Sequence, residues 1–289
     1  MKKTLIALAA VAATGAAFAQ SSVTLYGVAD ISVGDDNVTG SSFRAMANGF
    51  NNGNSRLGFK GTEDLGGGLK AGFNLEQGIS LANGAVDAPQ DFHRAAWLNV
   101  TGGFGEVRLG RSLSTSFYSV ASWELTGTAN YSVVAKQFGF AGAGSRNDAA
   151  IMYFSPAMGG FKFGASTVLK GNDANTTVAG QQGKYELSAT YAAGPMVASF
   201  AYNDTKDGDS GWGLGGKYNF GGFTVAGSYV DEENAAGTTT KKGFSLGAST
   251  MVGPMTLTFD IARDTEMKDT DWLLEAKYPL SKRTFTYAA

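Results

Sequence analysis

The chain contains no cysteine and only one histidine among its 289 residues. Without cysteine it can form neither disulfide bonds nor thiolate metal sites. With His93 as the single imidazole, it cannot build a catalytic or metal site that needs two histidines. A large excess of charge is also lacking, because 23 basic and 25 acidic side chains leave a formal net charge of −2. Nucleic acid is therefore not expected as a partner.

Long apolar segments are absent after residue 20, so no segment there has the roughly 20 residues that a membrane-spanning helix needs. The apolar run that does occur, from Leu5 to Ala13, follows two lysines and precedes the motif Ala17-Phe18-Ala19. This pattern predicts a secretory signal peptide over residues 1–19, with cleavage after Ala19. No linker-like composition divides residues 20–289, which we expect to form one folded domain.

Hydrophobic residues nevertheless make up 43% of the chain, and they alternate with polar residues. Between residues 255 and 263, for example, Leu257 and Phe259 share one face of an extended chain, while Thr258 and Asp260 share the other. A period of two predicts strands with one apolar and one polar face. Short turns marked by Gly or Pro alternate with longer polar loops between these strands.

On this basis we predict fifteen strands. They are expected near residues 23–34, 54–63, 69–81, 92–101, 105–111, 148–155, 161–169, 184–193, 196–203, 211–220, 223–231, 242–251, 255–263, 271–279 and 284–289. Short turns at one end and long loops at the other are typical of an antiparallel barrel. One interval is much longer than the others, and it predicts a large insertion over about residues 112–145.

Alternation alone does not distinguish a soluble sandwich from a barrel in a membrane. Three features favour a barrel with lipid outside and water inside. Charged side chains occur in the middle of polar faces, as at Lys162, Lys217, Asp260 and Glu275. Aromatic side chains gather near strand ends, where a membrane barrel has its girdles, at Tyr26, Tyr153, Phe154, Tyr191, Phe220 and Tyr278. Glycines on polar faces, at Gly213, Gly215 and Gly247, suit a lumen better than a packed core.

Four motifs in order resemble the Gram-negative general porins, especially the betaproteobacterial ones. They are VTLYGV at residues 23–28, SRLGFKGTEDLG at 55–66, FGEVRLGR at 104–111 and YPLSKRT at 278–284. The resemblance implies an all-β, transmembrane antiparallel β-barrel of 16 strands in the bacterial outer membrane. It also implies a homotrimer in contact with outer-membrane lipid and lipopolysaccharide, without a cofactor, whose third long loop folds inward and constricts the pore.

The insertion at residues 112–145 is the expected inward loop, with Phe117, Tyr118, Trp123 and Tyr131 as candidates to pack it against the wall. Its single acid is Glu124. In the family that this sequence resembles, loop carboxylates face a basic cluster on the wall. By motif position, Arg56, Arg94 and Arg146 match that cluster, and Arg111 and Lys60 are further candidates. Because Arg94 and Arg111 fall in phase with apolar residues, we expect a β-bulge or a covered inner face there.

Opposed charges at the narrowest point predict a water-filled channel for passive diffusion of small hydrophilic solutes and ions, with weak to moderate anion preference. Two alternatives remain: a closed structural or adhesive barrel, and an outer-membrane barrel enzyme, which the sequence opposes because it shows no catalytic constellation. Acidic loops at 204–209 and 264–269 could bind Ca²⁺, but solvated loops are the preferred interpretation. No metal site is expected.

The predicted strand over residues 284–289 ends with the chain, whereas the family that it resembles continues through one more loop and strand. We therefore expect the sixteenth strand and part of the fifteenth to be absent from this chain. An open barrel leaves unpaired backbone groups in lipid, so stable, heat-modifiable trimers are not expected from this chain alone.

Overall fold

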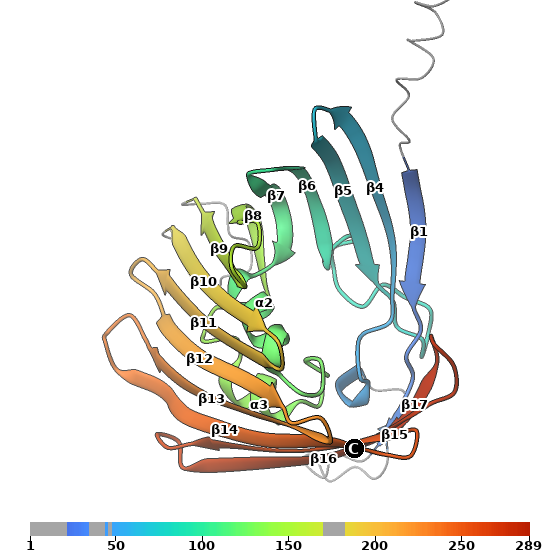
Figure 1. The fold of residues 1–289 in the computed structure, drawn as a ribbon, viewed down its shortest axis with the longest axis vertical. Coiled ribbons are helices and arrows are strands. Elements are labelled where there is room, and N and C mark those ends of the chain that lie inside the picture. Colours follow the sequence, from blue (N-terminus) through green and yellow to red (C-terminus); the bar gives the residue numbers. More distant parts are fainter. Residues whose placement is uncertain (1–21, 35–43, 46–47, 170–182) are drawn as a thin grey trace, which may run out of the picture.

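The structure, a computed structural model, describes residues 22–34, 44–45, 48–169 and 183–289. The predicted signal peptide lies outside these residues. Fifteen strands form one sheet in which each strand pairs with its neighbours along the chain, and every pair is antiparallel. Figure 1 shows this sheet curling into a barrel wall.

The strands of this sheet are β1 (Ser22–Val28), β4 (Arg56–Gly66), β5 (Leu69–Gly78), β6 (Ala95–Gly102), β7 (Gly105–Leu113), β8 (Arg146–Phe154), β9 (Phe161–Val168), β10 (Lys184–Ala193), β11 (Met196–Thr205), β12 (Ser210–Asn219), β13 (Phe223–Glu233), β14 (Thr239–Val252), β15 (Met255–Asp264), β16 (Asp269–Pro279) and β17 (Phe285–Ala288). A separate two-stranded sheet joins β2 (Val33–Gly34) and β3 (Arg44–Ala45), and a short 3-10 helix, η1, spans Asn48–Phe50.

Each predicted strand corresponds to one strand of the large sheet, although several ends differ. The first strand ends at Val28 rather than at residue 34. The side chains of Ser55 and Asn51 explain this early end, because both donate hydrogen bonds to the carbonyl of Asp30, and Ser55 also accepts one from its N–H. The backbone of Asp30 is thereby bonded to side chains instead of a neighbouring strand.

The two faces of the sheet follow the predicted alternation. Large apolar side chains remain exposed on the outer face, among them Leu25, Phe59, Leu98, Leu246 and Trp272. In water such a surface would be costly, whereas lipid covers it.

Two aromatic residues expected in the girdles point inward instead. The Tyr26 hydroxyl donates to Asn74 and Glu76, and the buried Phe154 ring packs near the guanidinium of Arg108. Both residues lie on the inward face of their strands, and Phe154 packs there with Met152 and Ala150. Closeness to a strand end therefore did not predict which face these two side chains occupy.

Strands β1 and β17 lie at the two edges of the sheet order. Within the described part of the chain no backbone ladder joins them, and side chains link their neighbourhoods. The Tyr287 hydroxyl donates to the Asp30 carboxylate (2.6 Å) and accepts from the N–H of Asn52 (3.0 Å). The expected absence of a sixteenth strand and of part of the fifteenth stays a prediction.

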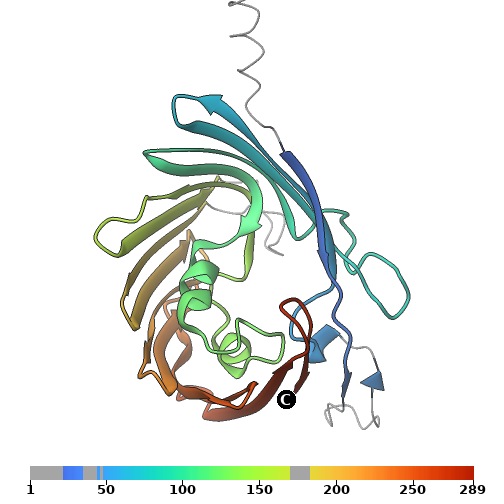
Figure 2. The ribbon, with the colours of Figure 1, turned by 45° about the vertical axis from the view of Figure 1, so that its right-hand side comes forward.

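Two short helices, which the sequence pattern did not predict, lie in the long insertion: α2 (Thr115–Trp123) and α3 (Val133–Phe138). Each begins after a serine, Ser114 or Ser132, whose hydroxyl accepts a hydrogen bond from the first turn, as N-cap residues do. Figure 2 shows both helices inside the curved wall. No helix among the described residues is long and apolar enough to cross a membrane.

Candidate pore constriction

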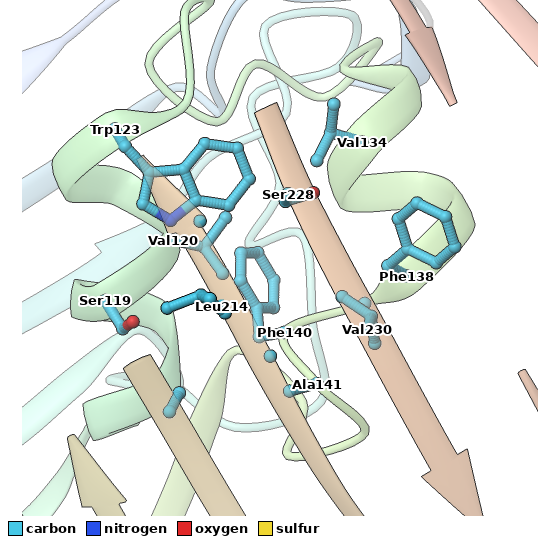
Figure 3. Close-up of a pocket in the computed structure, with 14 residues that line it drawn as sticks. Ser119, Val120, Trp123, Val134, Phe138, Phe140, Ala141, Leu214, Ser228 and Val230 are labelled. Carbon is cyan, nitrogen blue, oxygen red and sulfur yellow. The ribbon is translucent and has the colours of Figure 1, made fainter. Parts of the chain in front are cut away.

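The inward loop, residues 112–145, is held against one side of the wall. Helix α2 packs on β9–β12, and α3 packs on β14–β16. The indole of Trp123 lies directly over Gly215, where any Cβ atom would overlap the ring. Figure 3 shows Trp123, Val120, Phe138 and Phe140 around the small apolar cavity between loop and wall. Gly215, which suggested an open lumen, thus forms a notch in the wall, which means a space left by the missing side chain, and the Trp123 ring of the loop packs into this notch.

Buried ionic groups fix the stem of the inward loop. The Glu186 carboxylate accepts hydrogen bonds from the N–H (2.8 Å) and hydroxyl (2.9 Å) of Thr115 at the start of α2, and from Asn147 (2.7 Å). Lys184 pairs with Glu186 (3.1 Å) and donates to the carbonyl of Ala143. An acid at a helix N-terminus is favoured by the helix dipole, so this contact both orients and stabilises α2.

The far end of the inward loop is tied to β16 and to the first long loop. The Tyr131 hydroxyl donates to Glu275 (2.5 Å), and Lys277 donates to the carbonyl of Thr126 (2.9 Å). Burial and the neighbouring Glu275 carboxylate raise the pKa of Tyr131 above its ordinary value, so the phenol keeps its proton. Asn130 reaches Asn54, which is two residues from Arg56. The loop therefore spans the barrel, and on the β4–β8 side Tyr118 of α2 contacts Arg108 of β7 and Phe154 of β8.

The β4–β8 side of the wall carries the arginine cluster, which we define as Arg56, Arg94, Arg111 and Arg146. Its centre is Glu76 of β5, which the sequence analysis missed. The Glu76 carboxylate accepts from Nε of Arg94 (2.8 Å) and lies 3.6 Å from Nε of Arg56. Strand phase could have revealed it, because Glu76 pairs with Gly58 and faces inward together with Arg56.

The remaining two arginines lie beside this centre. Nε of Arg146 donates to the carbonyl of Arg94 (2.8 Å), and Arg146 is subject to the charges of the other three arginines and of Glu76. Arg111 donates to the Asp148 carboxylate and to the carbonyl of His93. The bulge expected at Arg111 is present, as a register shift between β7 and β8. The structure therefore brings together the three arginines matched by motif position and the further candidate Arg111.

Glu124 does not offer an exposed carboxylate to this cluster. Its carboxylate is only 3% exposed and accepts hydrogen bonds from Thr126 (2.7 Å), Ser132 (2.8 Å) and the N–H of Thr128 (2.6 Å). The acid therefore stabilises the turn between α2 and α3, contrary to the expected position facing the arginines. The other ionic side chain of the loop is the exposed Lys136.

Two further cations line the interior. Lys60 is exposed on the inner face of β4, with its ammonium 5.2 Å from the centre of the Tyr26 ring. Arg108, also missed from the sequence, is largely buried under α2. It pairs with Glu106 (2.7 Å), donates to Tyr118 (2.9 Å) and lies 4.2 Å from the Trp97 ring. Its satisfied contacts make Arg108 a support for the loop.

His93 and the acidic loop at 264–269 make local structural contacts. His93 contacts Asp87 (2.8 Å) and the carbonyl of Gln90, within the loop before β6. Asp264 accepts from the N–H groups of Glu266 and Met267, so it shapes its own turn. Within the described residues, no group of three or more potential ligands is arranged to hold a metal ion.

Comparison with known proteins gives a consistent set of relatives. The family model described as Gram-negative porin matches residues 4–289. Outer membrane porin protein 32 of Delftia acidovorans is 36% identical over 273 residues, which cover 88% of this chain and 77% of that protein. An outer membrane porin protein of Bordetella pertussis is 31% identical over 270 residues, covering 80% of this chain and 69% of the relative.

Among solved structures, an anion-selective porin from Comamonas acidovorans has a TM-score of 0.78 to this chain at 29% sequence identity. The match covers 93% of this chain and 87% of that one. A Salmonella typhi porin structure, in complex with daunomycin, is only 14% identical but still has a TM-score of 0.66, which supports the same fold.

Proposed function

The chain belongs to the Gram-negative porin family, and from that premise we propose that its pore passes small hydrophilic solutes and ions with a weak to moderate preference for anions. As a porin of the bacterial outer membrane, the protein is a channel and not an enzyme. The proposal concerns what the channel selects and which residues make the selection.

One observation carries this proposal: the arginine cluster faces a loop that has no exposed acid. Within the described residues, Arg56 and Arg94 contact the same carboxylate, that of Glu76, and Arg111 contacts the carboxylate of Asp148. The loop opposite contributes the exposed Lys136, while its Glu124 is buried. Charges around a narrow aqueous path act over a few ångströms. The local excess of positive charge beside the pore therefore affects ion selectivity more than the net negative charge of the chain does. The anion-selective structural relative agrees with this direction.

The test is the reversal potential of the purified protein in a planar bilayer under a KCl gradient. We expect a reversal potential whose sign shows that chloride is more permeant than potassium. Arg56→Ala should lower the anion-to-cation permeability ratio by about two- to fivefold. Arg283→Ala, in an exposed short turn, is the matched control and should leave the ratio unchanged. A cation preference that Arg56→Ala does not alter would contradict the proposal, and absence of conductance would favour a closed structural barrel.

We also infer a homotrimer, on the resemblance of the motifs and the shared family. Comparing unboiled with boiled samples on a denaturing gel tests both this inference and the expectation that the chain alone does not give stable, heat-modifiable trimers. A trimer band that changes to monomer on heating would support the homotrimer and refute that expectation, whereas a monomeric band in the unboiled, folded sample would contradict a homotrimer of this chain. Cleavage after Ala19 is checked by sequencing the mature N-terminus, where Gln20 is the expected first residue.

A further inference from the structure

A second group of cations lines the lumen between the arginine cluster and the short-turn end. This lysine group consists of Lys60 of β4, Lys162 of β9 and Lys217 of β12. Within the described residues, none of the three lies within ion-pair distance of a carboxylate. The three strands are far apart in the sheet order, so the lysines are distributed around the wall.

The register of the strands shows that all three lysines face inward. Lys60 alternates with the exposed Phe59, and Lys162 lies between the exposed Phe161 and Phe163. The ammonium of Lys162 is 5.7 Å from the centre of the inward Phe154 ring. Lys217 shares the phase of Gly215, the notch that receives Trp123 of the inward loop.

The lysine group is displaced along the pore from the arginine cluster. Arg56 and Arg146 are the first residues of β4 and β8, at the long-loop end. Lys60 is four residues farther along β4, about 13 Å at the usual strand rise. Lys162 is the second residue of β9, and Lys217 is the third from the end of β12, both close to short turns. In outer-membrane barrels that end faces the periplasm.

We propose that the lysine group forms a second, separate anion-attracting zone, which concentrates small inorganic and organic anions on the periplasmic side of the constriction. The proposal rests on the anion preference proposed above and adds a second location to it. Lys60 and Lys162 are exposed, and Lys217 is half-buried within reach of the Glu124 charge. Because none of the three forms an ion pair within the described residues, their field extends over the Debye length, about 30 Å at 0.01 M salt and 3 Å at 1 M. Their effect on ion flow is therefore large at low salt and lost at high salt.

The test is single-channel conductance of the full chain in KCl, in the triple variant Lys60→Gln/Lys162→Gln/Lys217→Gln. At about 0.03 M KCl we expect conductance to fall about twofold, and at about 1 M to change by less than about a fifth, because salt screens exposed charges. The matched control is Lys206→Gln/Lys241→Gln/Lys268→Gln, which removes the same charge at the long-loop end and should leave both values unchanged.

A charge-preserving variant, Lys60→Arg/Lys162→Arg/Lys217→Arg, should retain the low-salt conductance, and this separates charge from side-chain shape. The proposal is overturned if the Gln variant conducts like its control at low salt, or if its conductance falls equally at both salt concentrations. The Arg56→Ala measurement is independent, since a wild type without anion preference would refute the arginine proposal whatever the lysine variants do.

Discussion

At the scale of single residues, the main finding is that the acids near the pore have different tasks. Glu76 lies among the arginines, while Glu124 is buried in the loop and Glu186 holds the start of α2. Strand phase predicted the inward direction of Arg56, because alternation is a local property. It could not predict that Glu124 would be enclosed, because that depends on how the loop folds around the side chain.

Replacing Glu76 tests its place in the arginine cluster. Glu76→Gln removes the carboxylate that Arg56 and Arg94 share, so the local positive charge rises and the anion-to-cation permeability ratio should increase about two- to fivefold. Reversal potentials measure this ratio. Glu266→Gln, an exposed acid in an outer loop, is the control with the same charge change. A ratio that falls in Glu76→Gln would mean that the arginines need this acid to reach the pore.

Replacing Glu124 distinguishes a buried structural acid from one that faces the pore. Glu124→Gln loses acceptor capacity toward the loop, and we expect the free energy of unfolding to fall by about 1–3 kcal/mol, as for hydrogen bonds to charged groups. Urea unfolding in detergent, followed by tryptophan fluorescence, gives this value. Reversal potentials should stay unchanged, and a rise in anion preference like that of Glu76→Gln would place Glu124 at the pore after all.

At the scale of elements, the inward loop depends on the shape of the strand beneath it. The sequence analysis predicted the loop and three of its anchors, Tyr118, Trp123 and Tyr131, because aromatic residues in a polar insertion need a surface to cover them. The two helices were missed, although the serines that cap them, Ser114 and Ser132, are the ordinary signal of a helix start. The partners of the anchors lie far away in the sequence and were not predictable.

Filling the glycine notch should release the loop. In Gly215→Ala the new methyl group overlaps the indole of Trp123, so we expect a displaced loop, seen as noisier single-channel current and a conductance that differs from wild type. Gly213→Ala is the control on the same strand and face, where the nearest atom to a new Cβ lies at 3.4 Å. Equal behaviour of the two variants would show that the fit of Trp123 over Gly215 does not hold the loop.

At the scale of the whole molecule, the alternation of apolar and polar residues determined most of the fold. Lipid outside and water inside impose a period of two on every strand, so strand number and direction were predicted well from the sequence. Strand ends were predicted less well where a side chain forms a hydrogen bond with the backbone in place of a neighbouring strand, as Ser55 does with the carbonyl of Asp30. The grouping of the arginines required the register between strands, which alternation within one strand does not give.

The anion preference should depend on salt as a property of the whole pore. Lys60 and Lys162 are exposed in the interior, and Arg56 and Arg111 are partly exposed, so the attraction of these cations for anions is screened as the Debye length falls from about 30 Å at 0.01 M to 3 Å at 1 M salt. We expect the anion-to-cation permeability ratio to decrease steadily across this range. Reversal potentials at a fixed salt gradient and increasing mean concentration measure it, and a constant ratio would point to selection by pore size instead.

Tyr287 joins three distant parts of the chain. Its hydroxyl bonds to Asp30 and Asn52, and its ring lies 5.7 Å from that of Tyr131 in the inward loop. Contacts across such sequence separations form late, because the chain must first lose the entropy of closing long segments. Narrowing of the pore and the approach of the two sheet edges should therefore be completed in one final, cooperative step of assembly. Before this step the pore would be wide and would not select between ions. Ion selectivity measured on a single channel therefore also shows that the folding of that channel is complete.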